Sequence, residues 1–272
     1  MQLFKRLGWV ALLAAFLVAV LARGGLESLS TTIWDVELKE KAIACASFFA
    51  SPPQNATLVG AVFCYEEGRR EIKVSWSVPF KDGAKPLEVY LDLDLRVKGY
   101  RRGWLSGGEE TISFDDARHK AEGWLRNFTS GVEDVKLVFS SLSEGCWIFM
   151  WQQFHRGFYY DKEYFVVKLD AATGELVELR DNLGIIREGV VPEHPIAEDV
   201  AKKKAVEFVK KQFAGCEIKG VEAEPKIEYF GGTAGFRAVW KVYVDFVVGN
   251  AVKEHVVWVD PQDGEVLQSR LT

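Results

Sequence analysis

A twelve-residue pattern occurs twice in this chain and limits the folds that the chain can adopt. Residues 167–178 are VKLDAATGELVE and residues 257–268 are VWVDPQDGEVLQ, so the second copy begins 90 positions after the first. In both copies an alternating β-type run ends at Asp, Gly follows four residues later, Glu comes next, and a second β-type run begins. A pattern that recurs in this way indicates a repeated structural unit.

The Asp and the Gly of this pattern suit a tight turn. An Asp side chain at the end of a strand can accept backbone N–H groups of the turn, and Gly adopts a positive φ without the strain that a Cβ brings. We therefore predict a structural role, the shaping of a turn, for Asp170, Gly174, Asp260 and Gly264.

The segments before the two copies also correspond. Apolar spacing predicts helices over residues 115–128 and 196–213, whose alanines and large apolar residues correspond at an offset of 84. Alternating runs follow each helix and predict antiparallel strands, in which Trp151 corresponds to Trp240 at an offset of 89. Each half of this region is therefore expected to be one helix followed by a meander of strands.

A weaker copy precedes these two. It has an expected helix over 35–49, Trp76 in the place of Trp151, and an expected strand over 87–97 that carries Asp94 in the place of Asp170, but its turn lacks the Gly. We expect four segments: an N-terminal anchor or signal segment over 1–25, a degenerate unit over 26–110, and two better units over 111–182 and 183–272.

The helix with Ala at a four-residue spacing, the strand with a Trp, and the pattern V-x-D-x-x-x-G-E-V together resemble the PepSY domain. The resemblance covers residues 113–181 and 195–270, with an extension over 33–100. It implies an α+β fold, in which each repeated unit packs one helix on a curved antiparallel β-sheet. It also implies a non-catalytic module that binds or restrains peptidases outside the cell, in proteins that are often attached to a membrane.

The N-terminal 25 residues differ from the rest of the chain. Lys5 and Arg6 precede an uncharged run over residues 7–22, which is near the lower limit for a membrane span and slightly long for a signal-peptide core. We favour an uncleaved transmembrane anchor, and a removed signal peptide is the alternative. In both cases the basic residues before the apolar run place the following chain outside the cytoplasm, anchored to the cell membrane or secreted.

The exported part of the chain is acidic. Without Lys5, Arg6 and Arg23 the chain has 31 basic residues against 39 acidic ones. This balance argues against a nucleic acid as partner and against adhesion to anionic lipid.

Export permits two kinds of covalent modification. Cys45 lies on an expected helix and Cys64 on the next expected strand, which makes 45–64 the most plausible disulfide, with free buried thiols as the alternative. Asn55 and Asn127 each begin a sequence that fits N-glycosylation.

No pattern of a known catalytic or cofactor-binding site occurs in the sequence. It contains no G-x-S-x-G, no P-loop, no H-E-x-x-H and no G-x-G-x-x-G, and its histidines lie too far apart in sequence for a local metal site. We therefore expect no enzyme, no cofactor and no metal. A pocket that brings His155 or His255 next to acidic groups would favour an enzyme instead.

One aromatic cluster suggests a binding surface. Phe154, Phe158, Tyr159 and Tyr160 surround an expected hairpin turn, and hairpin tips are exposed to solvent. The alternative is that this tip packs onto a neighbouring unit. We expect the chain to bind a protein or peptide partner at the cell envelope, a peptidase being one version, and the competing hypothesis is an envelope scaffold that presents stacked repeats to other membrane proteins.

Overall fold

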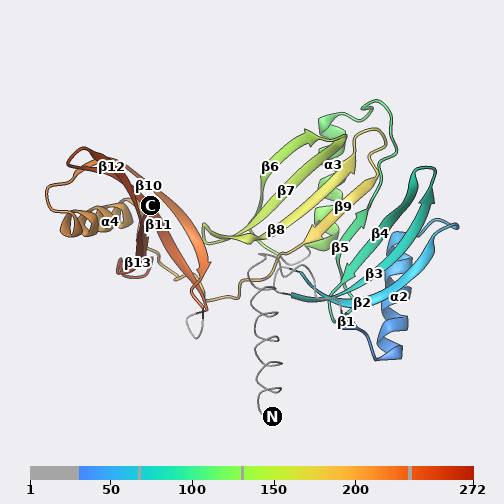
Figure 1. Ribbon diagram of the computed structural model, residues 1–272. Helices are drawn as coiled ribbons and strands as arrows, with labels where there is room; N and C mark the ends of the chain where they lie inside the picture. Colours follow the sequence, from blue (N-terminus) through green and yellow to red (C-terminus); the bar gives the residue numbers. More distant parts are fainter. Residues whose placement is uncertain (1–30, 67–68, 130–131, 232–234) are drawn as a thin grey trace, which may run out of the picture. The chain divides into compact units, whose positions relative to one another are not determined.

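The computed structural model describes residues 31–66, 69–129, 132–231 and 235–272, so the N-terminal run over 7–22 lies outside the described residues. The chain divides into two compact units, residues 1–103 and residues 104–272. In the described parts of the chain, a helix followed by four strands occurs three times, once in the first unit and twice in the second (Figure 1). The finer division into segments at residues 110 and 182 stays a prediction.

The first unit is one helix packed on antiparallel strands (Figure 1). The helix begins after Asp35, whose Oδ1 accepts the N–H of Leu38 at 3.0 Å, and it buries only small side chains, those of Ala42 and Ala46, against the sheet. The elements of this unit are β1 (Thr31–Thr32), α2 (Val36–Ala50), β2 (Thr57–Glu66), β3 (Arg69–Phe80), β4 (Gly83–Leu91) and β5 (Val97–Arg102).

The expected strand over 87–97 is broken by a turn. The side chain of Asp92 accepts the N–H groups of Asp94 and Arg96, each at 2.9 Å, and Leu95 has a φ of +61°. Asp92, and not Asp94 as expected, therefore takes the place that Asp170 has in the later copy. Leu95 adopts the left-handed conformation that Gly has there, in a turn that is one residue shorter.

The second unit contains two helices and eight strands in the residues that the structure describes. Helix α3 begins after Ser113, whose Oγ accepts the N–H of Asp116 at 3.2 Å and donates to its Oδ2 at 2.7 Å. The elements are α3 (Phe114–Phe128), β6 (Val135–Ser143), β7 (Cys146–His155), β8 (Phe158–Asp170), β9 (Leu176–Asp181), α4 (Glu198–Gln212), β10 (Glu217–Tyr229), β11 (Phe236–Val248), β12 (Ala251–Val259) and β13 (Val266–Leu271).

Strands β8 and β10 join the two halves of this unit in one sheet. Lys226 of β10 pairs in parallel with Tyr159 of β8, whereas the other strand pairs of the unit with a given register are antiparallel. Lys226 also donates to Asp161 at 2.6 Å and lies 4.0 Å from the centre of the Tyr159 ring. Burial lowers the pKa of Lys226, but its hydrogen bonds to Asp161 and Tyr159 outweigh burial and raise the pKa above its ordinary value.

The expected fold class is therefore wrong. We expected α+β units of one helix on an antiparallel sheet behind a membrane helix, but 50% of the described residues are in strands, 19% are in helices, and the sheet is large and mixed. The parallel contact between β8 and β10 continues the sheet from one half into the next, where separate sheets were expected. None of the helices in the described residues has the length and apolar character needed to cross a membrane.

The two halves of the second unit repeat one network of hydrogen bonds. The indole N–H of Trp147 donates to the carbonyl oxygen of Ile112 at 3.1 Å, and the N–H of Ile112 donates to the carbonyl oxygen of Ala171 at 3.2 Å. In the last half, the corresponding bonds run from Trp240 to Ile196 at 3.0 Å and from Ile196 to Pro261 at 2.7 Å. Trp240 therefore corresponds to Trp147 and not, as expected, to Trp151.

Candidate functional site

The turns after β8 and β12 are built by the same bonds. Oδ1 of Asp170 accepts the N–H of Ala172 at 2.9 Å, and the N–H of Gly174 donates to the carbonyl oxygen of Asp170 at 2.7 Å. Oδ1 of Asp260 accepts the N–H of Gln262 at 2.8 Å, and the N–H of Gly264 donates to the carbonyl oxygen of Asp260 at 2.9 Å. Gly174 and Gly264 have φ values of +70° and +79°, which a side chain with a Cβ rarely adopts.

A large pocket lies beside the turn between β7 and β8. It has a volume of about 870 Å³, and we call it the tip pocket. Its wall is formed by Gln153, Phe154 and His155 of β7, by Arg156 of the turn, by Glu133 and Asp134 before β6, and by residues of the segment after β9: Ile186, Arg187, Glu188, Gly189, Val191, Pro192 and Glu193. Four carboxylates against two guanidinium groups make this lining acidic.

A buried carboxylate holds one wall of the tip pocket. Glu163 of β8 is fully buried, with 0% of its surface exposed. Its Oε1 accepts the N–H groups of Ile185 at 2.6 Å and Ile186 at 3.0 Å, and its Oε2 lies 2.6 Å from Nε2 of His155. Glu163 therefore connects the segment after β9 and the His155 ring to strand β8.

The structure thus places His155 next to an acid in a pocket, which is the arrangement that would favour an enzyme. However, both oxygens of Glu163 are already engaged, one by two backbone N–H groups and the other by His155. No Ser, Thr, Cys, Lys or Tyr is among the described residues that line the tip pocket. The His155–Glu163 pair thus has no hydroxyl, thiol or amine side chain beside it among these residues, and its geometry suits the positioning of the pocket wall.

The four aromatic residues of the predicted binding tip have different environments. Phe158 is buried, with 2% exposed, and its ring packs edge-on against Trp240 at 5.1 Å between the centroids. Tyr160 packs in the same manner on Phe236, so the alternative of tip packing describes these two residues. Phe154 and Tyr159 are half-buried, and of the four only Phe154 lines the tip pocket. A role of this tip in partner binding stays a prediction.

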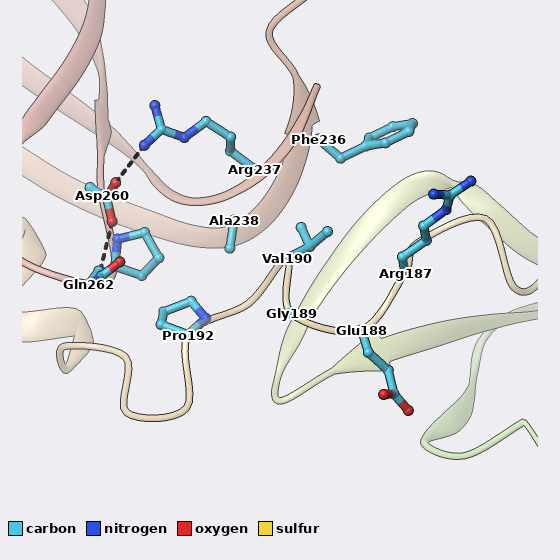
Figure 2. A pocket seen from close by; sticks show the side chains of 11 residues that line it. Arg187, Glu188, Gly189, Val190, Pro192, Phe236, Arg237, Ala238, Asp260 and Gln262 are labelled. Carbon is cyan, nitrogen blue, oxygen red and sulfur yellow. Dashed lines mark hydrogen bonds and ion pairs between the residues drawn. The ribbon is translucent and has the colours of Figure 1, made fainter. Parts of the chain in front are cut away.

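The second pocket lies next to the turn after β12, and we call it the turn pocket. It has a volume of about 500 Å³. Figure 2 shows Val190 and Pro192 on one side of it and Asp260 and Gln262 on the other. Oδ2 of Asp260 accepts a hydrogen bond from Nη2 of Arg237 at 3.2 Å, and the side chain of Arg237 is exposed. The remaining lining residues are Arg187, Glu188, Gly189, Phe236, Ala238 and Pro261.

His255, the second histidine that we considered for an enzyme site, lines neither pocket. His255 of β12 is 4% exposed and packs against the rings of Phe208 and Phe213, and neither ring nitrogen has a hydrogen-bond partner in the described part of the chain. Burial lowers the pKa of His255 below its ordinary value, because the charged form is poorly solvated there. His255 is a core residue and is not placed for acid–base catalysis.

The predicted modification sites are distributed over both units. Cys45 is exposed on α2 and carries a free thiol, so the structure does not contain the expected bond to Cys64, which is buried in β2. Asn55 is exposed in the loop before β2, and Asn127 is exposed in the last turn of α3. Glycosylation of the two asparagines stays a prediction. In the described residues, no three His, Cys, Asp or Glu side chains are grouped so that they could hold a metal ion.

No protein-family model and no curated protein sequence matches this chain. Among solved structures, the Bacillus megaterium YpeB C-terminal domain is similar: the alignment covers 86% of this chain and 96% of that chain, with 13% sequence identity and a TM-score of 0.49. A similarity at this level assigns neither a family nor a function to the chain.

Proposed function

We propose that this chain is a non-catalytic module that binds a protein or peptide partner outside the cytoplasm, a secreted peptidase being the specific version. The observation that carries the proposal is the tip pocket, which is open to solvent, has a volume of about 870 Å³ and includes Phe154 of the predicted binding tip. Pockets of this size lined by an aromatic ring and a few polar groups are typical binding sites.

Charge supports a peptide or protein with basic or N–H donor groups. Glu133, Asp134, Glu188 and Glu193 are exposed around the tip pocket, and exposed charges of one sign attract a partner of the opposite sign. The resemblance of the sequence to PepSY domains supports a peptidase as the partner, and the basic residues before the N-terminal apolar run support export.

The proposal is tested by capture and by inhibition. The purified chain is crosslinked to the secreted and envelope proteins of its own cell, and its effect on secreted metallopeptidases is measured at micromolar concentration. Captured peptidases that lose activity support the specific version. If the chain captures no secreted protein and leaves these peptidases fully active, the proposal is wrong.

A variant pair connects any capture to the tip pocket. Phe154→Ala removes the aromatic ring from the pocket and should weaken capture at least about tenfold, as expected for an aromatic residue at the centre of an interface. Phe139→Ala is the matched control, because Phe139 is exposed on β6 and does not line the pocket. Phe158 is kept in both proteins, because it is buried and its truncation would destabilise the fold.

The second candidate function is an envelope scaffold, which is favoured by the recurrence of a helix and four strands along the described chain. The same crosslinking experiment separates the two functions. Membrane-protein subunits captured equally by Phe154→Ala and by the unchanged chain would support the scaffold.

A further inference from the structure

A segment of the chain covers the turn after β8, and we call residues 105–111 the strap. The N–H of Ser106 donates to Oδ2 of Asp170 at 2.6 Å, and the N–H of Thr111 donates to the carbonyl oxygen of Ala171 at 3.0 Å. The hydroxyl of Thr111 donates to the carbonyl oxygen of Ala172. The strap therefore bonds three consecutive residues of this turn before the chain enters α3.

The corresponding segment in the last half takes a different path. Ile196 keeps the bond to the turn, through the carbonyl oxygen of Pro261 at 2.7 Å. The residues before it leave the turn, because Val191 is buried in a core cluster with Phe158 and Ile227, and Val190 packs against that cluster. The described residues of this segment thus place no backbone N–H on Oδ2 of Asp260, which is paired with the guanidinium group of Arg237.

The turn pocket lies where the strap would be. Asp260, Pro261 and Gln262 line the turn pocket, and they correspond to Asp170, Ala171 and Ala172, the three residues that the strap bonds. Val190 and Pro192, in the diverted segment, form the opposite wall (Figure 2). Its volume of about 500 Å³ lies within the range of sites that hold small ligands and short peptide segments.

We propose that the turn pocket binds an extended peptide segment that takes the position of the strap. The peptide donates a backbone N–H to Oδ2 of Asp260, displacing the guanidinium group of Arg237, and donates a hydroxyl or N–H group to the carbonyl oxygen of Gln262. This inference rests on the proposed function, because it names a site and a ligand chemistry for a module that binds peptides.

The strap itself indicates which peptides fit. Together with Trp104, which precedes it, the strap has the sequence WLSGGEET, and Gly107 and Gly108 have φ values of +70° and +125°. Two small residues that tolerate positive φ are therefore expected after the residue that donates its N–H. Carboxylates follow the glycines in the strap, and the guanidinium group of Arg187 at the turn pocket suits such carboxylates.

The experiment uses the octapeptide WLSGGEET, acetylated and amidated at its ends, as the probe. It is titrated into the full chain, and the backbone amide signals of Gln262 and Ala238 are followed by NMR. The control peptide carries proline at the position of Ser106 and so lacks the N–H that would bond Asp260. A hydrogen bond to a charged acceptor is lost with it, so the control peptide should bind at least about tenfold more weakly.

Variants of the protein test the acceptor. Asp260→Asn keeps Oδ1 for the N–H of Gln262 but replaces Oδ2 by an NH₂ group, and it should weaken binding of the octapeptide at least about tenfold. Asp263→Asn is the matched control: it makes the same change of charge in the same turn, but Asp263 does not line the pocket, and binding should be unchanged. Arg237→Met removes the competing donor and should tighten binding by no more than about fivefold, the worth of an exposed ion pair.

The inference is overturned if the proline peptide binds as tightly as the octapeptide, or if Asp260→Asn and Asp263→Asn behave alike. It is also overturned if the amide shifts occur only around the tip pocket. Phe154→Ala separates this result from the proposed function, since it should weaken partner capture and leave binding of the octapeptide unchanged. Partner capture without octapeptide binding would refute the inference alone, and octapeptide binding without any captured partner would refute the proposed function alone.

Discussion

Truncation of Glu163 is expected to release the segment after β9 from strand β8. In Glu163→Ala the N–H groups of Ile185 and Ile186 lose their shared acceptor, and an unsatisfied buried donor costs about 1–3 kcal/mol. The N–H of Ile186 is the buried one of the two, and that of Ile185 is partly accessible. We therefore expect the local free energy of opening to fall by about 3 kcal/mol.

Glu163→Gln separates the effect of the hydrogen-bond acceptor from the effect of the negative charge of Glu163. Its amide oxygen can still accept the N–H groups of Ile185 and Ile186, while the charge-assisted contact to His155 is lost, so the cost should be about 1–2 kcal/mol. The measurement is native-state hydrogen exchange at Ile185 and Ile186, because the chain has two compact units and a single unfolding midpoint would average over them. Glu188→Ala, an exposed change in the same segment, is the control and should change exchange by less than a factor of about three.

The expected exchange rates follow from these free energies. A loss of 3 kcal/mol corresponds to a rise in the exchange rate of Ile186 of about a hundredfold. If Glu163→Ala and Glu163→Gln accelerate exchange equally, the hydrogen bonds to the two backbone groups do not hold the segment and our account of this wall of the tip pocket is wrong.

Three further changes test the turns and the core. Leu95→Gly should raise the free energy of unfolding of the first unit by about 0.5–1 kcal/mol in urea, because Leu95 has a φ of +61°, and a loss of stability would contradict the strained turn. Gly174→Ala and Gly264→Ala should each cost about 1–2 kcal/mol in urea unfolding, with the greater cost at Gly174, where the added methyl group would lie 3.2 Å from Cδ1 of Ile112. Burial lowers the pKa of His255 in the folded chain, so the unfolded chain takes up the proton first as the pH falls below about 6.5. The free energy of unfolding should therefore fall below this pH by at most about 1.4 kcal/mol per pH unit. His255→Leu should remove this slope when urea unfolding is measured as a function of pH.

The helices and several strands could be predicted from the sequence, because their signals are local. Apolar spacing predicted the start of α3 at residue 115, one residue after its observed start at Phe114. The break at Asp92 was missed, because residues 91–95 alternate Leu and Asp as a half-exposed strand does, and only the positive φ of Leu95 distinguishes the turn. The N-terminal part of β10 has no clear strand signal in the sequence, since residues 217–225 contain Glu, Gly and Pro, which are rare in strands.

The correspondence of the tryptophans failed for a different reason. Each half contains two large aromatic residues four positions apart, Trp147 and Trp151 in the first and Phe236 and Trp240 in the last. On the sequence alone, Trp240 can therefore be aligned with either Trp151 or Trp147. The hydrogen-bond acceptor decides between the two alignments. Trp147 and Trp240 each donate the indole N–H to the carbonyl oxygen of the residue two positions before a helix, which is Ile112 before α3 and Ile196 before α4. Neither pocket could be predicted, because each depends on the path of the segment after β9, which is set by the long-range contacts of Glu163 and Val191.

One carboxylate oxygen distinguishes the copies of the repeated turn. In each described copy the turn uses Oδ1 of its Asp for its own backbone, as Asp92, Asp170 and Asp260 show. The closing of the turn therefore does not determine what Oδ2 contacts. At Asp170 it is bonded by the strap, whereas at Asp260 it lies in a pocket with an exposed arginine as its partner. A residue that is structural in every described copy thus offers a binding group in the last copy, whose preceding segment is drawn into the core, and this is where peptide recognition is best sought.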